Sequence, residues 1–200
     1  MTRTLEFFFD FISPFSYVAY HALPHALEGL DVEVQYRPVF LGAIMHTTGN
    51  RPPGLVPAKG TYMVKDLARC CGRYGIDYRM NPHFPLMSTR PLLRAACGLA
   101  DQPEEQKRFI ETVFHRVWAA SEPLKTDDEE QVLAMCEQAG FDGEHIRSLS
   151  EDETAKAAML TNTNEAIERG AFGAPSFFVG NELFFGHDRL DYAAEALRAS

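Results

Sequence analysis

A serine followed by a proline marks the point where an apolar segment gives way to a helical pattern. Ser13-Pro14 has the residue types of a helix N-cap followed by proline at the first helical position. The free N–H groups at such a helix start carry partial positive charge, which stabilises an anionic group of a ligand. These two residue types alone favour a simple helix cap. A catalytic role for Ser13 is the alternative, and the position of this helix in the fold and the other motifs of the chain decide between the two.

The cysteines and histidines do not predict a metal site. The chain has four cysteines: Cys70, Cys71, Cys97 and Cys136. They form neither a C-x-x-C pair nor a zinc-binding spacing. His21 and His25 are four residues apart, but no glutamate follows His21 and Pro24 interrupts the helix between them. We expect structural or surface histidines, and reduced thiols in a cytoplasmic protein.

The net charge narrows the class of partner. The chain carries a formal net charge of -9, whereas nucleic acids and anionic membrane surfaces require a basic face. No apolar run approaches the roughly 18 residues of a membrane helix, and no secretory signal peptide is visible at the N-terminus. The sequence therefore favours a small-molecule ligand over a nucleic acid or a membrane.

The elements that would position Ser13 form a strand–helix–strand unit. Residues 4–11 are apolar and aromatic enough for a buried strand, and residues 31–37 alternate with period 2. Between them, the helix that starts at Pro14 is expected to end at Gly29. Because a single helix joins the two strands, we expect them to be parallel.

The middle of the chain has a helical pattern. Residues 42–58 are rich in glycine and proline, and we expect them to form a long functional loop. Helical periodicity begins at Lys59. It recurs over four further segments: 89–100, 104–119, 127–139 and 151–169. No strand is expected between residues 41 and 171.

The C-terminal residues return to strands. Residues 175–179 and 182–185 flank Gly180-Asn181, which is a short hairpin signal. A final helix is expected after Asp188.

The resulting element order is β-α-β, an all-helical insertion, then α-β-β-α. This is the topology of an α/β, thioredoxin-like fold. We expect residues 1–40 and 152–200 to form a discontinuous thioredoxin-like domain, and residues 41–151 to form a helical insertion domain.

A thioredoxin-like fold gives the position of Ser13 a particular meaning. In such folds the place after the first strand holds the first cysteine of a C-x-x-C pair. Here Ser13-Pro14-Phe15-Ser16 keeps the spacing with hydroxyls in place of both thiols. A dithiol redox cycle is therefore impossible at this site. The helix N-terminus would still stabilise a thiolate that a ligand brings.

Four motifs follow one another over nearly the whole chain: Phe9-Asp10-Phe11-Ile12-Ser13-Pro14-Phe15-Ser16-Tyr17; Gly49-Asn50-Arg51-Pro52-Pro53 with Pro57-Ala58-Lys59-Gly60-Thr61-Tyr62; Phe172-Gly173-Ala174-Pro175-Ser176-Phe177; and Gly186-His187-Asp188-Arg189-Leu190. Together, and in this order, they resemble the 2-hydroxychromene-2-carboxylate isomerases and kappa-class glutathione transferases, a family of the DsbA-like thioredoxin superfamily.

The resemblance implies glutathione as the cofactor. Ser13 matches the catalytic serine that holds the glutathione sulfur, and Asp188 matches the carboxylate near the γ-glutamyl amine. Ala174 precedes a cis-proline in the family and pairs its backbone with the cysteinyl unit. The full set of implied glutathione contacts is Ser13, Asn50, Lys59, Ala174, Pro175, Asp188 and Arg189. Implied substrate contacts are Asn50, Arg51 and Phe84, the last standing where the family has a tyrosine.

The family resemblance implies a homodimeric isomerase that acts with glutathione on 2-hydroxychromene-2-carboxylate-type aromatic pyruvate derivatives. A kappa-like transferase or peroxidase acting on electrophiles is the alternative. Asn50-Arg51-Pro52-Pro53 favours that alternative, as does the absence of a lysine from residues 41–45, where the isomerases carry one. A non-catalytic thioredoxin-like binding module is a third hypothesis, which the loss of both site cysteines would suit.

Overall fold

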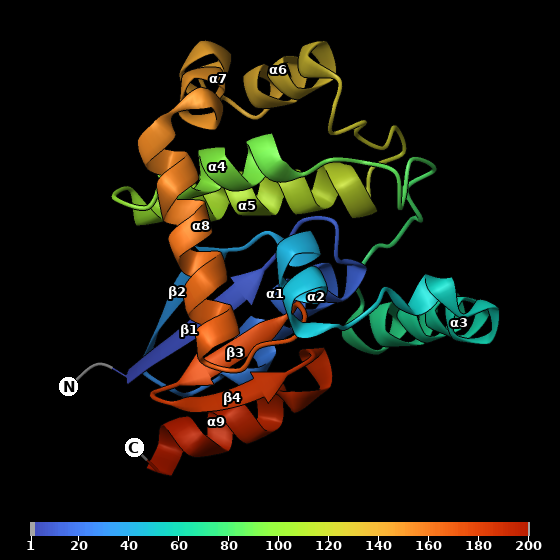
Figure 1. Cartoon of the computed structure of the whole chain (residues 1–200), viewed down its shortest axis with the longest axis vertical. Helices are drawn as coiled ribbons and strands as arrows, with labels where there is room; N and C mark the ends of the chain where they lie inside the picture. The colour runs from blue at the N-terminus through green and yellow to red at the C-terminus, as the bar shows by residue number, and fades with distance from the viewer. Residues whose placement is uncertain (1–2, 200) are drawn as a thin grey trace.

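The computed structural model describes residues 3–199 as an α/β fold built on a four-stranded sheet (Figure 1). The strands are β1 (Arg3–Phe9), β2 (Val32–Pro38), β3 (Ser176–Val179) and β4 (Glu182–Phe185). The helices are α1 (Pro14–Ala26), α2 (Leu41–Thr48), α3 (Pro57–Tyr74), α4 (Arg90–Gly98), α5 (Pro103–Trp118), α6 (Glu129–Gln138), α7 (Gly143–Glu151), α8 (Glu153–Glu168) and α9 (Leu190–Ala199). Two short 3-10 turns are η1 (Pro53–Leu55) and η2 (His187–Arg189).

The sheet has the strand order β2-β1-β3-β4. β1 and β2 are parallel, with Phe7 opposite Tyr36, and β3 runs antiparallel to β1, with Phe177 opposite Phe7. β3 and β4 form an antiparallel hairpin. The order of elements and the parallel first pair confirm the thioredoxin-like fold that the sequence predicts.

β1 is apolar on both faces because helices cover both sides of the sheet. Phe7 and Phe9 belong to the large core that includes side chains of α1, α5 and α9. Phe8 points to the opposite face, into a smaller core with Ile44 of α2 and Ala166 of α8. Alternation along the strand thus sends successive phenylalanines into different cores. Because β1 is fixed on both faces, it holds the segment that follows its C-terminal end, including Ser13, in a defined position.

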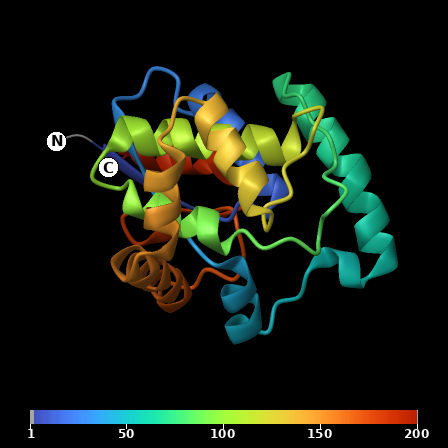
Figure 2. The ribbon, with the colours of Figure 1, turned by 90° about the horizontal axis from the view of Figure 1, so that it is seen from above.

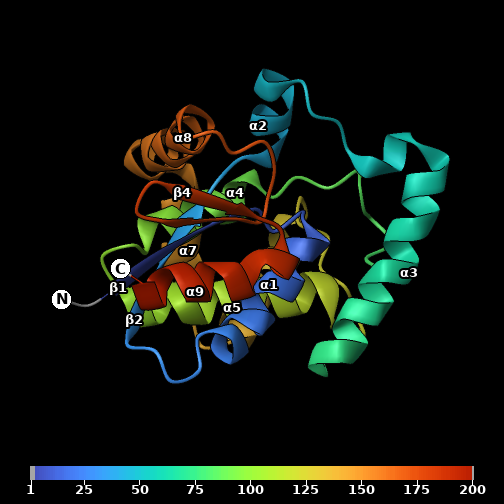
Figure 3. The ribbon, with the colours of Figure 1, turned by 90° about the horizontal axis from the view of Figure 1, so that it is seen from below.

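α3 stands apart from the rest of the molecule. It projects from the body in all three ribbon views (Figures 1, 2 and 3). It packs on α1, where Leu67 and Cys71 contact Val18. α4 to α7 form a separate layer above the sheet in Figure 1. Within residues 3–199, no strand is formed between β2 and β3, as predicted.

The prediction of a loop over residues 42–58 is wrong in part. The segment begins with a two-turn helix, α2, and later contains η1. The N–H of Leu41 donates to the Asp10 carboxylate, 3.0 Å away, which supplies the cap that the local sequence lacks. Gly49, at φ +73°, then ends the helix in a conformation that favours glycine. A second helix that the pattern did not predict is α7.

None of the described helices is long and apolar enough to cross a membrane. No cluster of three or more His, Cys, Asp or Glu side chains able to hold a metal ion occurs among residues 3–199. The four cysteines are free thiols, three of them buried.

Candidate functional site

Ser13 is the N-cap of α1, at the C-terminal end of β1. Its Oγ accepts a hydrogen bond from the Ser16 N–H at 3.1 Å and donates one to the Ala174 carbonyl at 2.9 Å. The side chain is nearly buried, with 5% of the residue exposed. Ser13 therefore caps its helix, as predicted, and also joins the helix start to a loop 161 residues further along the chain.

The Ala174–Pro175 segment faces the start of α1. The peptide bond between these two residues is cis, as the resemblance implies. Ala174 is half-buried, whereas Pro175 is buried and its carbonyl accepts from the Gly186 N–H at 3.0 Å. The last hydrogen bond connects this loop to η2. Three predicted residues, Ser13, Ala174 and Pro175, are thus brought together directly.

Two main-chain donors beside Ser13 have no partner within the described part of the chain. One is the Phe15 N–H, in the first turn of α1, and the other is the Ala174 N–H. Unpaired N–H groups at a helix start attract an anion. An unpaired N–H next to an extended segment pairs with another peptide. The arrangement can therefore hold a ligand that carries both an anionic group and a peptide bond.

Asn50 lies against the same loop. Its Nδ2 donates to the Phe172 carbonyl at 2.8 Å, and its Oδ1 accepts from the Arg51 N–H at 2.8 Å. Gly173 leaves the necessary space, because a Cβ there would lie 2.8 Å from Cε2 of Phe185 and 3.7 Å from Nδ2 of Asn50. The structure thus brings Asn50 to the Ala174 loop, through main-chain contacts rather than through Ser13 itself.

Three further predicted residues have no recorded contact with Ser13 or the Ala174 loop. Lys59, in the first turn of α3, and Arg51 are exposed, and neither side chain makes a hydrogen bond or ion pair within residues 3–199. Both cations are therefore available to an anionic ligand. Phe84 packs edge-on against Trp118, with ring centroids 5.6 Å apart. Trp118 is fully buried and donates from Nε1 to the Phe11 carbonyl at 2.8 Å, so it is a core residue.

Asp188 and Arg189 lie in η2. The Asp188 carboxylate is mostly exposed and accepts from Nη1 of Arg189 at 3.0 Å. Gly186, at φ +95°, has the Asp188 Oδ1 only 2.6 Å from the position of a Cβ, so a larger residue there would displace this carboxylate. The Gly186 N–H is also the group that bonds to Pro175. η2 is therefore fixed to the Ala174 loop at one end.

Asp10 is a buried residue of the site region that the sequence reasoning did not single out. Its carboxylate is 1% exposed and accepts from the Ile12 N–H, the Leu41 N–H and the Thr89 hydroxyl. Burial raises the pKa of this carboxyl, although the three donors oppose the shift. The signal was present, because one aspartate stands between phenylalanines in Phe9-Asp10-Phe11. A charged residue in so apolar a run points to a buried polar role.

His187 and Cys70 form a second pair that the sequence did not predict. Nε2 of His187 lies 3.1 Å from Sγ of Cys70, although 117 residues separate them. Their contact joins η2 to α3, on the side of α1 that carries Phe15.

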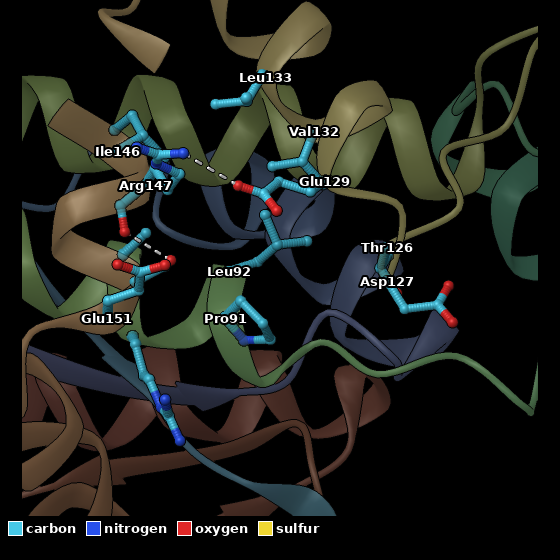
Figure 4. Close-up of a pocket in the computed structure, with 13 residues that line it drawn as sticks. Pro91, Leu92, Thr126, Asp127, Glu129, Val132, Leu133, Ile146, Arg147 and Glu151 are labelled. Carbon is cyan, nitrogen blue, oxygen red and sulfur yellow. Dashed lines mark hydrogen bonds and ion pairs between the residues drawn. The ribbon is translucent and has the colours of Figure 1, made fainter. Parts of the chain in front are cut away.

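Two hollows of the surface lie away from these residues. A cavity of about 310 Å³ opens between α4, α6 and α7, over Leu92, Val132 and Ile146, and Arg147 and Glu129 form an ion pair of 3.5 Å beside it (Figure 4). A cavity of about 410 Å³ lies along α1, β2 and α5. Neither is lined by a residue predicted for the site.

Comparisons with known proteins identify the family of this chain. Residues 4–198 match the DSBA-like thioredoxin domain. The chain is 29% identical over 195 residues to a 2-hydroxychromene-2-carboxylate isomerase of Sphingobium xenophagum, covering 96% of each protein. It is 31% identical over 205 residues to glutathione S-transferase kappa 1 of Caenorhabditis elegans, covering 97% of this chain and 90% of the relative.

A solved structure of a 2-hydroxychromene-2-carboxylate isomerase superposes with a TM-score of 0.85 at 26% identity, covering 98% of this chain and 95% of that chain. Similarity thus extends over nearly the full length in both sequence and structure. The chain belongs to the DSBA-like thioredoxin family, among the 2-hydroxychromene-2-carboxylate isomerases and kappa-class glutathione transferases.

Proposed function

We propose that this protein is a glutathione-dependent isomerase of 2-hydroxychromene-2-carboxylate-type aromatic pyruvate derivatives. The observation that carries the proposal is the contact between the Ser13 hydroxyl, at the start of α1, and the Ala174 carbonyl, before a cis-proline. A redox dithiol is missing from this position, yet the donors that would stabilise a thiolate are kept. Relatives that are an isomerase and a glutathione transferase support the same conclusion.

The groups around Ser13 fit glutathione in their chemistry. Unpaired N–H groups of Phe15 and Ala174 suit a sulfur anion and a peptide backbone respectively. The exposed Asp188 carboxylate suits an ammonium group. The proposed glutathione contacts are Ser13, Asn50, Lys59, Ala174, Pro175, Asp188 and Arg189. Lys59 and Asn50 would bind a carboxylate of the tripeptide, and Arg189 and Pro175 would shape the site through their main chains.

Glutathione, when bound, would supply a nucleophilic thiolate for reversible addition to a conjugated carbon of the opened substrate, which would allow the former double bond to rotate. Ser13 is the residue that acts on this sulfur. Its hydroxyl has one proton, which in this structure is donated to the Ala174 carbonyl. A ligand N–H that donates to that carbonyl would replace Ser13 there. The serine proton is then free to point at the sulfur, while Oγ keeps its bond from Ser16 N–H.

The substrate would be held by groups that match its charges. A pyruvate carboxylate and a phenolate are both anionic, and Arg51 is an exposed cation without a partner within residues 3–199. Asn50 is a neutral polar group next to Arg51 in the chain, and its side chain bonds to the Ala174 loop at Phe172. Phe84, backed by Trp118, offers an aromatic face for the substrate ring. These contacts would orient the substrate and stabilise the charge that develops on it.

A kappa-like transferase acting on electrophiles is the second candidate. The relative at 31% identity is a kappa-class transferase, and the same Ser13 site would serve both reactions. In a transferase the sulfur would stay bound to an electrophilic substrate instead of leaving it.

We further propose that the protein is a cytoplasmic homodimer. The four free thiols suit a reducing compartment. Exposed apolar side chains gather on η1 and α3: Leu55, Val56, Tyr62 and Val64. Such a group of side chains is typical of an interface. Light scattering after size-exclusion chromatography would give twice the chain mass if this is correct.

The experiment that tests the function is a set of turnover assays with and without glutathione. The expected result is isomerisation of 2-hydroxychromene-2-carboxylate that requires glutathione. Conjugation of a chloronitrobenzene without isomerisation would assign the transferase reaction instead. Neither activity, with no binding of glutathione, would leave a non-catalytic module and end the proposal.

A further inference from the structure

The contact between Cys70 and His187 joins the two segments that carry Lys59 and Asp188 of the proposed glutathione site. Cys70 lies on α3, and Lys59 lies in the first turn of the same helix. His187 is the first residue of η2, directly before Asp188. Nε2 and Sγ are 3.1 Å apart, well within the distance of a sulfur hydrogen bond. The contact therefore links the segment of Asp188 to the segment of Lys59.

α3 has few other fixed connections. It packs on α1 through Leu67 and Cys71 but otherwise projects from the body (Figure 3). Among residues 3–199, the bond to His187 is the only side-chain hydrogen bond between α3 and another helix, turn or strand. The remaining contacts of α3 are its packing on α1 and, just past its C-terminal end, the hydrogen bond from the Tyr17 hydroxyl to the Asp77 carbonyl. Loss of the Cys70–His187 bond would therefore remove the side-chain hydrogen bond that joins α3 directly to η2.

η2 depends on the same contact. The His187 ring packs edge-on against Phe15, with centroids 5.4 Å apart. Its Nδ1 is buried and has no partner within the described residues. Among residues 3–199, the thiol is thus the one hydrogen-bond partner of this ring. At its other side, η2 is tied to the Ala174 loop through the Gly186 N–H.

The surroundings of both partners favour their uncharged forms. Burial lowers the pKa of His187, and the carboxylates of Asp188 and Asp66 oppose that shift only in part. Burial also raises the pKa of the Cys70 thiol, helped by Asp66 and Asp188 and opposed by Arg73 and Arg69. Either the thiol or the ring N–H can donate in this hydrogen bond, depending on the tautomer of His187. Such a bond orients two segments without adding charge to a ligand site.

We propose that Cys70 and His187 are positioning residues of the glutathione site, whose hydrogen bond sets the spacing between the Asp188 carboxylate on η2 and Lys59 on α3. This inference rests on the proposed function for the identity of the ligand. The pair acts through Asp188 and Lys59, which lie outside the Ser13 contact. The consequence is that losing the pair weakens binding of glutathione and leaves the chemistry at Ser13 unchanged.

The test compares Cys70→Ala with two matched variants. Cys70→Ser restores a donor at the same position, and Cys71→Ala removes a neighbouring thiol of α3 that packs on Val18 and does not contact His187. For each we would measure the glutathione Kd by calorimetry, KM and kcat for turnover, and hydrogen exchange of the main chain of α3 and η2. Thermal melting would confirm that all variants fold.

In Cys70→Ala, we expect the glutathione Kd and KM to rise by roughly three- to tenfold, the range for one lost neutral hydrogen bond. We expect kcat to stay unchanged and hydrogen exchange of η2 to become faster. Cys70→Ser should recover part of the affinity, and Cys71→Ala should keep the Kd of the unaltered protein. A fall in kcat with constant KM would overturn the inference, as would an equal loss in Cys71→Ala.

The same experiment separates this inference from the proposed function. If the unaltered protein binds no glutathione, the proposed function fails, and the role of Cys70 and His187 in positioning a glutathione site fails with it. If it binds glutathione and Cys70→Ala binds equally well, only the positioning inference fails. Hydrogen exchange needs no ligand, so unchanged exchange of η2 in Cys70→Ala would show independently that the contact does not hold this turn.

Discussion

Ser13 has two roles that a substitution can separate. It caps α1 through the Ser16 N–H and bonds to the Ala174 carbonyl. Ser13→Ala should cost about 1 kcal/mol for the cap and about 1 kcal/mol for the second hydrogen bond, which a domain of this size tolerates. Turnover should fall by roughly ten- to a hundredfold, because a hydrogen bond to a thiolate contributes about 1.5–3 kcal/mol. Steady-state kinetics and urea unfolding measure both effects.

Ser16→Ala is the matched control for this substitution. The Ser16 Oγ is buried and has no partner within the described residues, so its removal should leave turnover intact. Ser13→Cys would in addition place a thiol where a mixed disulfide with glutathione can form, which intact-mass measurement would detect. Full turnover in Ser13→Ala would mean that Ser13 is only a helix cap, and the mechanism would have to be abandoned.

Asp10 should make stability depend on pH in an unusual direction. Burial raises the pKa of its carboxyl in the folded protein. The folded state then binds the proton more tightly than the unfolded chain, whose aspartate titrates near about 3.9. The contribution of Asp10 to the free energy of unfolding must therefore fall as the pH rises from the pKa of the unfolded chain through the higher pKa of the folded protein. Asp10→Asn removes this titration.

The measurement is urea unfolding of both proteins between acid and neutral pH. Asp10→Asn should lower the free energy of unfolding by about 1–3 kcal/mol. The amide N–H₂ of asparagine would face one of the groups that now donate a hydrogen bond to the carboxylate. The difference between the two proteins should shrink as the pH rises. Asp142→Asn, at the exposed N-cap of α7, is the control for the same change of residue type at the surface. A difference that grows with pH would show that the three hydrogen bonds outweigh burial.

The candidate site could be read from the sequence only where local signals exist. Ser13 stands at a helix start and Pro175 before a strand, so both carry a local pattern. The pairing of Asn50 with Phe172, and of Cys70 with His187, depends on loop geometry and on the angle of α3. No periodicity encodes such contacts between distant segments. They are known only once the fold brings the segments together.

Among the elements, β1, β2 and α8 are joined by a network of ion pairs. Glu6 of β1 pairs with Arg37 of β2 at 2.7 Å and with Arg169, after α8, at 2.7 Å. Both arginines also pair with Glu165 of α8. Three side chains of the network are about four-fifths buried: Glu6, Arg37 and Arg169. Solvent therefore screens the attraction between their charges only in part.

Glu6→Gln should therefore destabilise the fold by about 1–2 kcal/mol, because two cations lose half of their charged partners. Glu153→Gln is the control, since Glu153 pairs with Lys156 on an open surface and such pairs contribute well under about 1 kcal/mol. Chemical unfolding at low and high salt measures both. If Glu6→Gln loses no more than Glu153→Gln, the network does not hold the strands to α8.

Elements with their own pattern were predicted correctly, whereas two short helices were not. α2 spans a segment with Gly42 and two threonines, which are poor helix formers. It forms because Asp10 caps it from a distant strand and Ile44 enters the core. α7 carries a readable N-cap in Asp142, but it is short and lies directly between the longer helices α6 and α8. α2 was not predicted because tertiary contacts stabilise it, and α7 was not predicted because its short pattern lies directly between two other helices.

At the scale of the whole molecule, the order of elements was sufficient to predict the thioredoxin-like fold. A strand–helix–strand start and a hairpin followed by a helix leave few ways to complete one sheet. The arrangement of the intervening helices was not predictable in the same way, because their packing has no strand register to fix it. The division into two domains at residues 40 and 152 stays a prediction.

Glutathione should stabilise the whole protein against heat. A ligand that binds only the folded state adds RT ln(1 + [L]/Kd), which is about 2.7 kcal/mol at a hundredfold excess over Kd. For a chain of this length, that corresponds to a rise in Tm of roughly 5–10 °C. Differential scanning fluorimetry with increasing glutathione, up to several millimolar, measures the shift.

Asp188→Asn is the variant that makes this thermal shift specific. Asp188 is mostly exposed and has Arg189 as its one ion-pair partner within residues 3–199, so the substitution should hardly change the Tm of the free protein. It removes the charge that would bind the γ-glutamyl amine, and the shift with glutathione should therefore shrink. An equal shift in both proteins would place the tripeptide elsewhere. No shift in the unaltered protein at millimolar glutathione, together with no calorimetric heat, would refute the cofactor itself.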